Sequence, residues 1–264
     1  MDVNNLFSIK QGKVALITGG AKGVGLMIST AFVSAGAKVY ISSRDATACA
    51  SACATLNTIT PNSAFSLPAD LQSEKEVHRL AAELTKLEPG GLHILINNSG
   101  ATWGEPYEKY PDAAWTKLLT LNLTRVFTLT QALTPLLIKG SKQDDPARVV
   151  NIGSIDGLRV PLLPTFAYSA SKAGLHHLSR HLAVELGPKG ITVNNLACGP
   201  FPSKMMKHTL DTMGEVIKEA NPLGRVGQPE DVGGACLFLC SRAGGYVNGA
   251  TLALDGGVHL MAKI

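Results

Sequence analysis

The sequence predicts a single-domain α/β fold, a doubly wound parallel sheet of seven strands with helices on both faces. Short segments rich in Val, Ile and Leu alternate along the chain with longer segments of helical periodicity. The strand segments are unbroken apolar runs, as expected of parallel strands that are buried on both faces. No linker rich in Pro, Gly or Ser divides the 264 residues. We therefore expect one domain over residues 1–264, with its binding edge at the carboxyl ends of the strands.

Apolar runs and helical spacing along the sequence predict the order of strands and helices. Strands are expected at the short apolar runs, residues 13–18, 38–43, 64–67, 93–96, 148–152, 191–196 and 251–254. Helices are expected between them, at residues 24–36, 46–56, 73–87, 112–138, 168–186 and 230–239. Gly36 suits the left-handed residue that ends the first helix. The cofactor half should cover about residues 13–155 and a substrate loop about residues 199–222.

Composition argues against several classes of function. The net charge is only +4, and the densest basic stretch, Lys204–Lys207, contains two methionines and no arginine, so no nucleic-acid partner is expected. The N-terminus lacks the apolar core of a signal peptide, and no apolar run reaches the roughly 18 residues of a membrane span. We expect an intracellular, cytoplasmic protein without a membrane partner. The C-terminal Ala262-Lys263-Ile264 resembles a relaxed peroxisomal targeting tripeptide, and peroxisomal import stays open beside a tail without a targeting role.

The sequence does not predict a metal site. Its five cysteines show neither C-x-x-C nor Cys/His metal spacing, so they are interpreted as buried thiols of a protein in a reducing compartment. His177 and His181 are four residues apart, but no acidic or Cys partner is near them in sequence.

A glycine-rich turn, Thr18-Gly-Gly-Ala-Lys-Gly-Val-Gly25, lies between the first strand and the first helix and is typical of Rossmann-type folds. Glycines there let the backbone approach a pyrophosphate at the helix N-terminus. The expected contacts are Gly19, Lys22, Gly23, Val24 and Gly25.

The second strand ends in Ile41-Ser-Ser-Arg44, where a site specific for NAD usually carries a carboxylate. Arg44 and Lys22 supply two cations, with Ser43 beside them, and this set suits a ribose 2′-phosphate. The sequence thus favours NADPH/NADP+ as the cofactor. Asp45 follows directly and is expected to cap the next helix.

Tyr168 and Lys172 are spaced to lie on one face of a helix. A free phenol titrates near ~10, too high for efficient acid–base work at neutral pH, and a fixed cation beside it lowers that pKa. Ser154 follows the strand at residues 148–152 and should reach the same edge of the sheet. These three residues predict a site that polarises and protonates a reacting oxygen.

With these motifs in view, the chain resembles the short-chain dehydrogenase/reductase family over nearly its whole length. The resemblance implies that Tyr168 is the proton donor, that Ser154 polarises the carbonyl, and that Lys172 holds the nicotinamide ribose. It implies that Asn122 anchors a water that relays protons to Lys172. It also implies cofactor contacts from Asp70, Leu71, Asn98, Gly100, Gly199 and Ser203, as well as from Tyr168 and Lys172 themselves.

Within that family the chain looks most like the rhamnolipid-type 3-oxoacyl reductases and their fungal relatives. The segments that carry this likeness are Gly100–Gly104, Tyr110-Pro111 and Phe201–Met205. Two positions depart from the family pattern: Ser99 replaces an alanine, and Cys198 replaces the proline that usually precedes Gly199. The resemblance implies that this loop presses on the nicotinamide face, so the second departure bears on the stereochemistry of hydride transfer.

The side chains expected at the mouth of the site are apolar: Trp103, Leu158, Phe166, Phe201 and Met205. The function predicted from them is reduction of a carbonyl, a 3-oxoacyl group or another ketone, on an apolar small molecule. A fungal alkaloid-pathway imine or iminium reductase with Diels–Alder cyclase activity is one alternative, and a non-catalytic nucleotide-binding protein is another. The resemblance also implies a homo-oligomer, a tetramer or a dimer.

Overall fold

The structure, a computed structural model, describes residues 3–9 and 12–261. Within them, seven strands form one parallel sheet in the order β3-β2-β1-β4-β5-β6-β7. The strands are β1 Val14–Thr18, β2 Lys38–Ser42, β3 Ala64–Ser66, β4 Ile94–Asn97, β5 Ala147–Ile152, β6 Ile191–Cys198 and β7 Thr251–Leu254. The strand order reverses between β1 and β4, and open α/β sheets bind their ligands outside the carboxyl ends of the strands at such a point.

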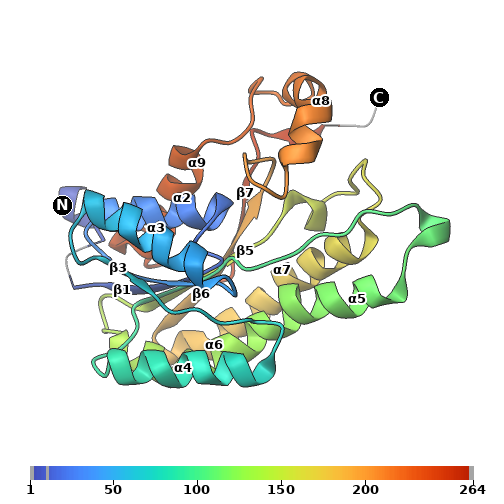
Figure 1. Ribbon diagram of the computed structural model, residues 1–264. Coiled ribbons are helices and arrows are strands. Elements are labelled where there is room, and N and C mark those ends of the chain that lie inside the picture. Colours follow the sequence, from blue (N-terminus) through green and yellow to red (C-terminus); the bar gives the residue numbers. More distant parts are fainter. Residues whose placement is uncertain (1–2, 10–11, 262–264) are drawn as a thin grey trace.

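Helices cover both faces of this sheet (Figure 1). One layer consists of α2 Gly23–Ser34, α3 Ala46–Ile59 and α9 Pro229–Cys240. The other consists of α4 Glu74–Leu87, α5 Asp112–Leu119, α6 Arg125–Gly140 and α7 Phe166–Leu186. The short helix α1, Val3–Leu6, precedes β1, and α8, Lys207–Glu219, stands clear of both layers (Figure 1).

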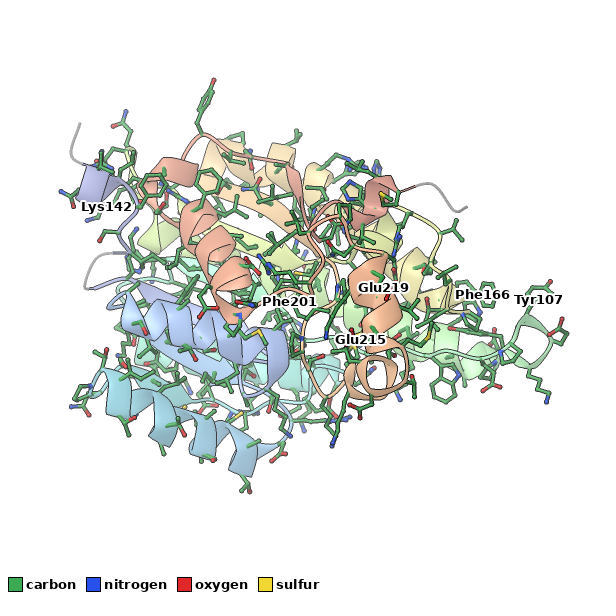
Figure 2. The ribbon with its side chains drawn as sticks, turned by 90° about the horizontal axis from the view of Figure 1, so that it is seen from above. Tyr107, Lys142, Phe166, Phe201, Glu215 and Glu219 are labelled. Carbon is green, nitrogen blue, oxygen red and sulfur yellow. The ribbon has the colours of Figure 1, made fainter. Side chains whose placement is uncertain are left out.

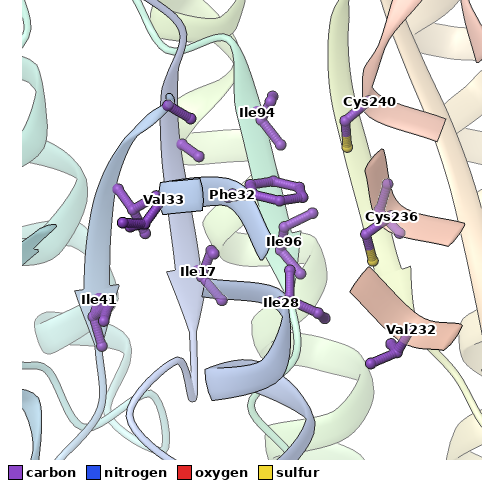
Figure 3. Packing of buried hydrophobic residues seen from close by; sticks show 14 of the residues in the cluster. Ile17, Ile28, Phe32, Val33, Ile41, Ile94, Ile96, Val232, Cys236 and Cys240 are labelled. Carbon is purple, nitrogen blue, oxygen red and sulfur yellow. The ribbon is translucent and has the colours of Figure 1, made fainter. Parts of the chain in front are cut away.

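The alternation of side chains along the strands separates two hydrophobic clusters. On β1, Ile17 faces the layer of α2 and α9, whereas Leu16 faces the layer of α4 and α6, and both are fully buried. Figure 3 shows the first cluster, in which Phe32 of α2 lies between strand isoleucines and Cys236 of α9. Burial on both faces explains why most of the strand residues are apolar.

The expected sheet and its helical layers are confirmed, with differences at element ends. Residues 112–138 are not one helix, because a π-helical turn at Thr120–Thr124 separates α5 from α6. Helix α7 begins two residues before Tyr168, at Phe166. The predicted substrate loop at about residues 199–222 is wrong where α8 forms, and this helix is largely exposed.

Other expectations concern single residues. All five cysteines are free and buried, which confirms their interpretation as small apolar side chains. Asp45 caps α3, accepting a hydrogen bond from the Ala48 N–H at 2.9 Å, as expected. No helix within the described ranges is long and apolar enough to cross a bilayer. The C-terminal tripeptide, Ala262 to Ile264, lies outside the described residues.

Candidate active site

The predicted site residues meet at one edge of the sheet, because each follows the carboxyl end of a parallel strand or begins a helix there. The glycine turn follows β1, Ser43 and Arg44 follow β2, and Asp70 and Leu71 follow β3. Asn98 and Gly100 follow β4, Ser154 follows β5, and Gly199 and Ser203 follow β6. Tyr168 and Lys172 lie in the first two turns of α7.

The glycine turn is held against β4 by reciprocal hydrogen bonds. The Thr18 hydroxyl accepts from the Asn98 and Ser99 backbone N–H groups at 2.9 and 3.0 Å, and the Asn98 amide donates to the Thr18 carbonyl at 2.9 Å. A Cβ at Gly25 would lie 2.2 Å from the Gly19 carbonyl oxygen, so the turn closes only around glycine. Helix α2 has no side-chain cap, which leaves its first N–H groups to an anion.

Charged side chains from the end of β2 and from the glycine turn lie close together. The Lys22 ammonium lies 3.0 Å from the Asp45 carboxylate, and both side chains are about half exposed. The hydrogen bond from Ala48 and then the one from Lys22 lower the pKa of Asp45 below its usual value. Arg44 is exposed and makes no ion pair or hydrogen bond with any residue that the structure describes.

Ser154 and Tyr168 lie at the centre of the candidate site. Ser154 is buried and precedes a single 3₁₀ turn at Ile155–Gly157, where its hydroxyl accepts from the Asp156 N–H at 3.1 Å. Burial of the Tyr168 phenol raises the pKa of Tyr168 well above its usual value. An interaction with the Ser154 hydroxyl opposes this rise. The phenol therefore keeps its proton at neutral pH.

Lys172 lies one turn further along α7 and is buried. Its ammonium donates to the Ile152 carbonyl at 2.7 Å and lies 5.7 Å from the centre of the Tyr168 ring. Burial lowers the pKa of Lys172 to about 8. The sequence analysis expected a cation to lower the pKa of Tyr168, but burial dominates that pKa in the protein itself.

Asn122 lies in the π-helical turn and is buried. Its amide accepts from the Ala101 N–H and donates to the Ala101 carbonyl, both at 2.9 Å, and it also donates to the Ser171 hydroxyl at 3.0 Å. A Cβ at Gly100 would meet the Asn122 oxygen at 3.3 Å and the Lys172 nitrogen at 3.7 Å. Gly100, Asn122 and Lys172 therefore lie close together. The water relay expected at Asn122 stays a prediction.

The sequence analysis did not find the support behind Ser154, which is His176. Its ring is buried, neither ring nitrogen has a partner among the described residues, and burial lowers its pKa to about 4. A Cβ at Gly153 would lie 2.2 Å from the His176 Nε2, and one at Gly157 would lie 2.9 Å from its Cε1. The neutral imidazole thus fills the space behind the turn that carries Ser154. Its spacing of four residues from Lys172 was the available signal.

The residues expected to line the substrate pocket fall into two groups. Trp103, Leu158, Phe166 and Met205 are 37–46% exposed and offer apolar surface. Phe201 is 2% exposed and belongs to the hydrophobic cluster on the α2 face, so it is a core residue rather than part of a pocket surface. Its ring packs against Gly227, where an added Cβ would lie 2.4 Å from ring carbons.

Phe166 belongs to an aromatic group that the sequence analysis did not anticipate. Its ring stacks edge-on against Tyr110 and Tyr107, with centroid distances of 5.2 and 5.9 Å. Figure 2 shows Phe166 beside Tyr107 at one end of the molecule, well away from Phe201. The Tyr110 hydroxyl accepts from the Ala167 N–H at 3.2 Å, so this group also fixes the start of α7.

This geometry can be compared with known proteins. A family model described as enoyl-(acyl carrier protein) reductase matches residues 19–259, which include the glycine turn, Ser154, Tyr168 and Lys172. The chain belongs to the short-chain dehydrogenase/reductase family.

Two relatives of this short-chain dehydrogenase/reductase are 3-oxoacyl-(acyl-carrier-protein) reductases. The rhamnolipids biosynthesis enzyme of Pseudomonas aeruginosa is 43% identical over 255 residues, covering 94% of this chain and 97% of that protein. The FabG enzyme of Aquifex aeolicus is 32% identical over 248 residues, covering 94% and 98%. The solved active-site complex of Pseudomonas aeruginosa RhlG with NADP has a TM-score of 0.93 at 42% identity, covering 97% of this chain and 99% of that one.

The residues of this short-chain dehydrogenase/reductase fit a nicotinamide cofactor with a 2′-phosphate. The glycine cradle admits no Cβ at Gly25, and α2 begins without a side-chain cap. Arg44 follows β2, and Lys22 reaches Asp45 from the glycine turn after β1; a carboxylate in place of Arg44 would instead favour the unphosphorylated ribose. No group of three His, Cys, Asp or Glu side chains suited to a metal ion occurs in the described parts of the chain.

Proposed function

We propose that this chain is an NADPH-dependent reductase that acts on the carbonyl of an apolar substrate, with a 3-oxoacyl group as the first candidate. The observation that carries the proposal is the meeting of Ser154, Tyr168 and the buried Lys172 at the edge where the glycine turn begins α2. The 3-oxoacyl relatives, which match nearly the whole chain, support the substrate class.

When bound, NADPH supplies the hydride that the carbonyl carbon accepts. The Ser154 hydroxyl and the Tyr168 phenol then donate hydrogen bonds to the carbonyl oxygen and stabilise the charge that develops there. Tyr168 delivers its proton to that oxygen. Its raised pKa suits this direction, because reduction requires the protonated phenol. Lys172 holds positive charge beside Tyr168 and stabilises the phenolate that remains after the transfer.

The two alternatives from the sequence have weaker support. A nucleotide sensor does not require Ser154, Tyr168 and Lys172 to be brought together, and the relatives reported above are reductases. An imine or iminium reductase would share this site, but an iminium is already cationic and needs less help from Tyr168. The two chemistries can therefore be separated by one substitution.

That substitution is Tyr168→Phe. We expect it to lower kcat/KM for a 3-oxoacyl thioester by roughly 10²–10⁴-fold, because the general acid is removed. The affinity for NADPH should not change. The measurement is NADPH oxidation followed by its absorbance, with NADPH binding measured separately by fluorescence titration.

The matched control is Tyr246→Phe, since Tyr246 is fully exposed and far from Tyr168 in the sequence. Retention of carbonyl reduction by Tyr168→Phe would contradict the proposal. A large loss with ketones together with a small loss with cyclic imines would favour the imine alternative.

We also propose a homo-oligomer, a tetramer or a dimer. Strand β7 is an edge strand, and its Leu252 is 38% exposed. Pairing with a second copy would cover this exposed apolar edge, which is otherwise open to solvent. Light scattering would measure the oligomeric state.

Cytoplasmic location, and import into peroxisomes through the C-terminal tripeptide, remain predictions from the sequence. A fluorescent fusion of the last ten residues would test the import.

A further inference from the structure

The substrate loop crosses directly over the phosphate-binding turn. Gly23 has φ +52, and a Cβ placed on it would lie 3.0 Å from the Ser203 Cβ. Ser203 also accepts from the Met206 N–H through its hydroxyl at 3.2 Å, which fixes a tight turn just before α8 begins at Lys207. Residues far apart in sequence are therefore in contact at this point.

The Gly23–Ser203 contact brings two lysines together. Lys22 precedes Gly23 and Lys204 follows Ser203, so these two cations flank the contact from different segments. The charge of Lys204 contributes to the lowered pKa of Asp45, after the hydrogen bonds from Ala48 and Lys22, which places Lys204 in the field of the same carboxylate. Lys207 does not contribute to that pKa.

The local charges do not balance. Two exposed cations, Lys22 and Lys204, act on the Asp45 carboxylate, which is already engaged by Lys22 and by the start of α3, and the exposed Arg44 directly precedes Asp45 in the chain. Neither Arg44 nor Lys204 has a hydrogen-bond or ion-pair partner among the described residues. A dianionic phosphate is the chemical group that such an excess of positive charge binds best.

We propose that Lys204, carried by the substrate loop, completes the binding site for the 2′-phosphate of the cofactor and thereby fastens that loop over the phosphate-binding turn. The inference rests on the proposed NADPH function and extends it. Arg44 and Lys22 bind the phosphate from the sheet side, and Lys204 binds it from the loop. A cofactor without the 2′-phosphate leaves the loop unfastened at this point.

The loop is held at its two ends, near its start also by the buried Phe201 and by the Gly227 N–H, which donates to the Pro200 carbonyl at 2.9 Å, whereas most of α8 is exposed. At its start the Gly199 N–H donates to the Leu254 carbonyl at 3.0 Å, and at its end the Asn221 amide donates to the Asp255 carbonyl at 2.9 Å. Between these anchors, α8 stands apart from the helical layers (Figure 1). A bound 2′-phosphate adds a further anchor.

The test uses adenosine 2′,5′-bisphosphate as the probe and ADP as its partner without the 2′-phosphate. We expect Lys204→Gln to weaken 2′,5′-bisphosphate binding by roughly 5–10-fold in calorimetry, as the loss of one charge-assisted contact predicts. ADP binding should not change. The matched control is Lys207→Gln, an exposed lysine of the same loop, which should leave both affinities unchanged.

Trypsin cleavage after Lys207 provides a second measurement, independent of turnover. The 2′,5′-bisphosphate should slow this cleavage in the unmodified protein and not in Lys204→Gln, whereas ADP should slow it in neither. Equal affinity and equal protection in Lys204→Gln and the unmodified protein would overturn the inference alone. Failure of the unmodified protein to bind either NADPH or the 2′,5′-bisphosphate would overturn the proposed function as well.

Discussion

The buried Lys172 is expected to lower the stability of the folded protein while serving the proposed chemistry at Tyr168. Its ammonium is buried, and burial lowers its pKa from 10.5 to about 8. Between those two pH values the unfolded chain binds more protons than the folded protein, so this residue's contribution to stability rises with pH across that window. Below about pH 8 its charge is a constant cost to the folded state.

We therefore predict that Lys172→Met inactivates the enzyme and yet stabilises it at pH 7. Removal of the buried charge should raise the free energy of unfolding by on the order of 2–3 kcal/mol. Loss of the hydrogen bond to the Ile152 carbonyl should lower it by about 1 kcal/mol. The gain should shrink as pH rises from 8 to 10.5, the window between the two pKa values. Urea denaturation of both proteins without nucleotide, at several pH values, measures it. A variant less stable than the unmodified protein at pH 7 would contradict this account.

The central site residues could be predicted at this scale because their spacing is local. Tyr168 and Lys172 share a helical face, and Ser154 directly follows a recognisable strand. The packing of His176 against Gly153 could not be predicted, because it joins α7 to the turn after β5. Phe201 was assigned to the pocket by its loop position, whereas its ring turns into the core.

At the scale of elements, the packing of α9 on α2 leaves no room for a side chain at one glycine of α9 and ample room at the next. Gly233 is buried, and a Cβ on it would lie 2.8 Å from the Ala31 Cβ of α2. Gly234 is exposed, and nothing lies within 4 Å of the position of its Cβ. Both have helical neighbours in α9, so backbone propensity favours alanine equally at the two positions.

Gly234→Ala should stabilise the protein by about 0.5–1 kcal/mol, because alanine loses less backbone entropy in a helix. Gly233→Ala should destabilise it by roughly 1–3 kcal/mol, because the methyl group forces α9 away from α2. Each variant is the other's control, and the free energy of unfolding in urea measures both. Stabilisation by both substitutions would show that α9 moves away from α2 without cost, and destabilisation by Gly234→Ala would contradict the propensity argument.

Element boundaries divide into those that the sequence specifies and those that contacts specify. The strands and α4 could be placed from apolar runs and helical spacing alone. The π-helical turn at Thr120–Thr124 could not, since it depends on Asn122 bonding to Ala101 and Ser171 from other segments. Helix α8 lacks a buried face that would have marked it.

At the scale of the whole molecule, the doubly wound parallel sheet follows from chain alternation and right-handed crossovers, and the observed sheet confirms it. Because every strand is parallel, all the loops that carry chemistry lie at one edge. This explains why motifs scattered over more than half of the chain could be predicted to form one site. The relation of the substrate loop to the glycine turn needed the structure, because the loop is not a strand or helix at that point.

The reactivity of the five cysteine thiols measures whether the sheet and its covering helices stay folded. Cys49 and Cys53 lie in α3, Cys198 ends β6, and Cys236 and Cys240 lie in α9, and all are buried. Burial raises the pKa of Cys53 to about 11 and those of Cys198 and Cys240 to about 12. At pH 8 these groups are almost entirely protonated, and the thiolate is the reactive form.

We predict that the native protein reacts with Ellman's reagent at pH 8 only at the rate of its global unfolding, and that all five thiols react at once in guanidinium. The reason is that the reagent needs both access and a thiolate, and only loss of the sheet and its covering helices provides both. Mass spectrometry of the partly labelled protein, in rising urea, measures the order of reaction. Labelling of Cys49 and Cys53 ahead of the other three would show that α3 opens as a unit of its own, and the molecule would then not unfold as one cooperative structure.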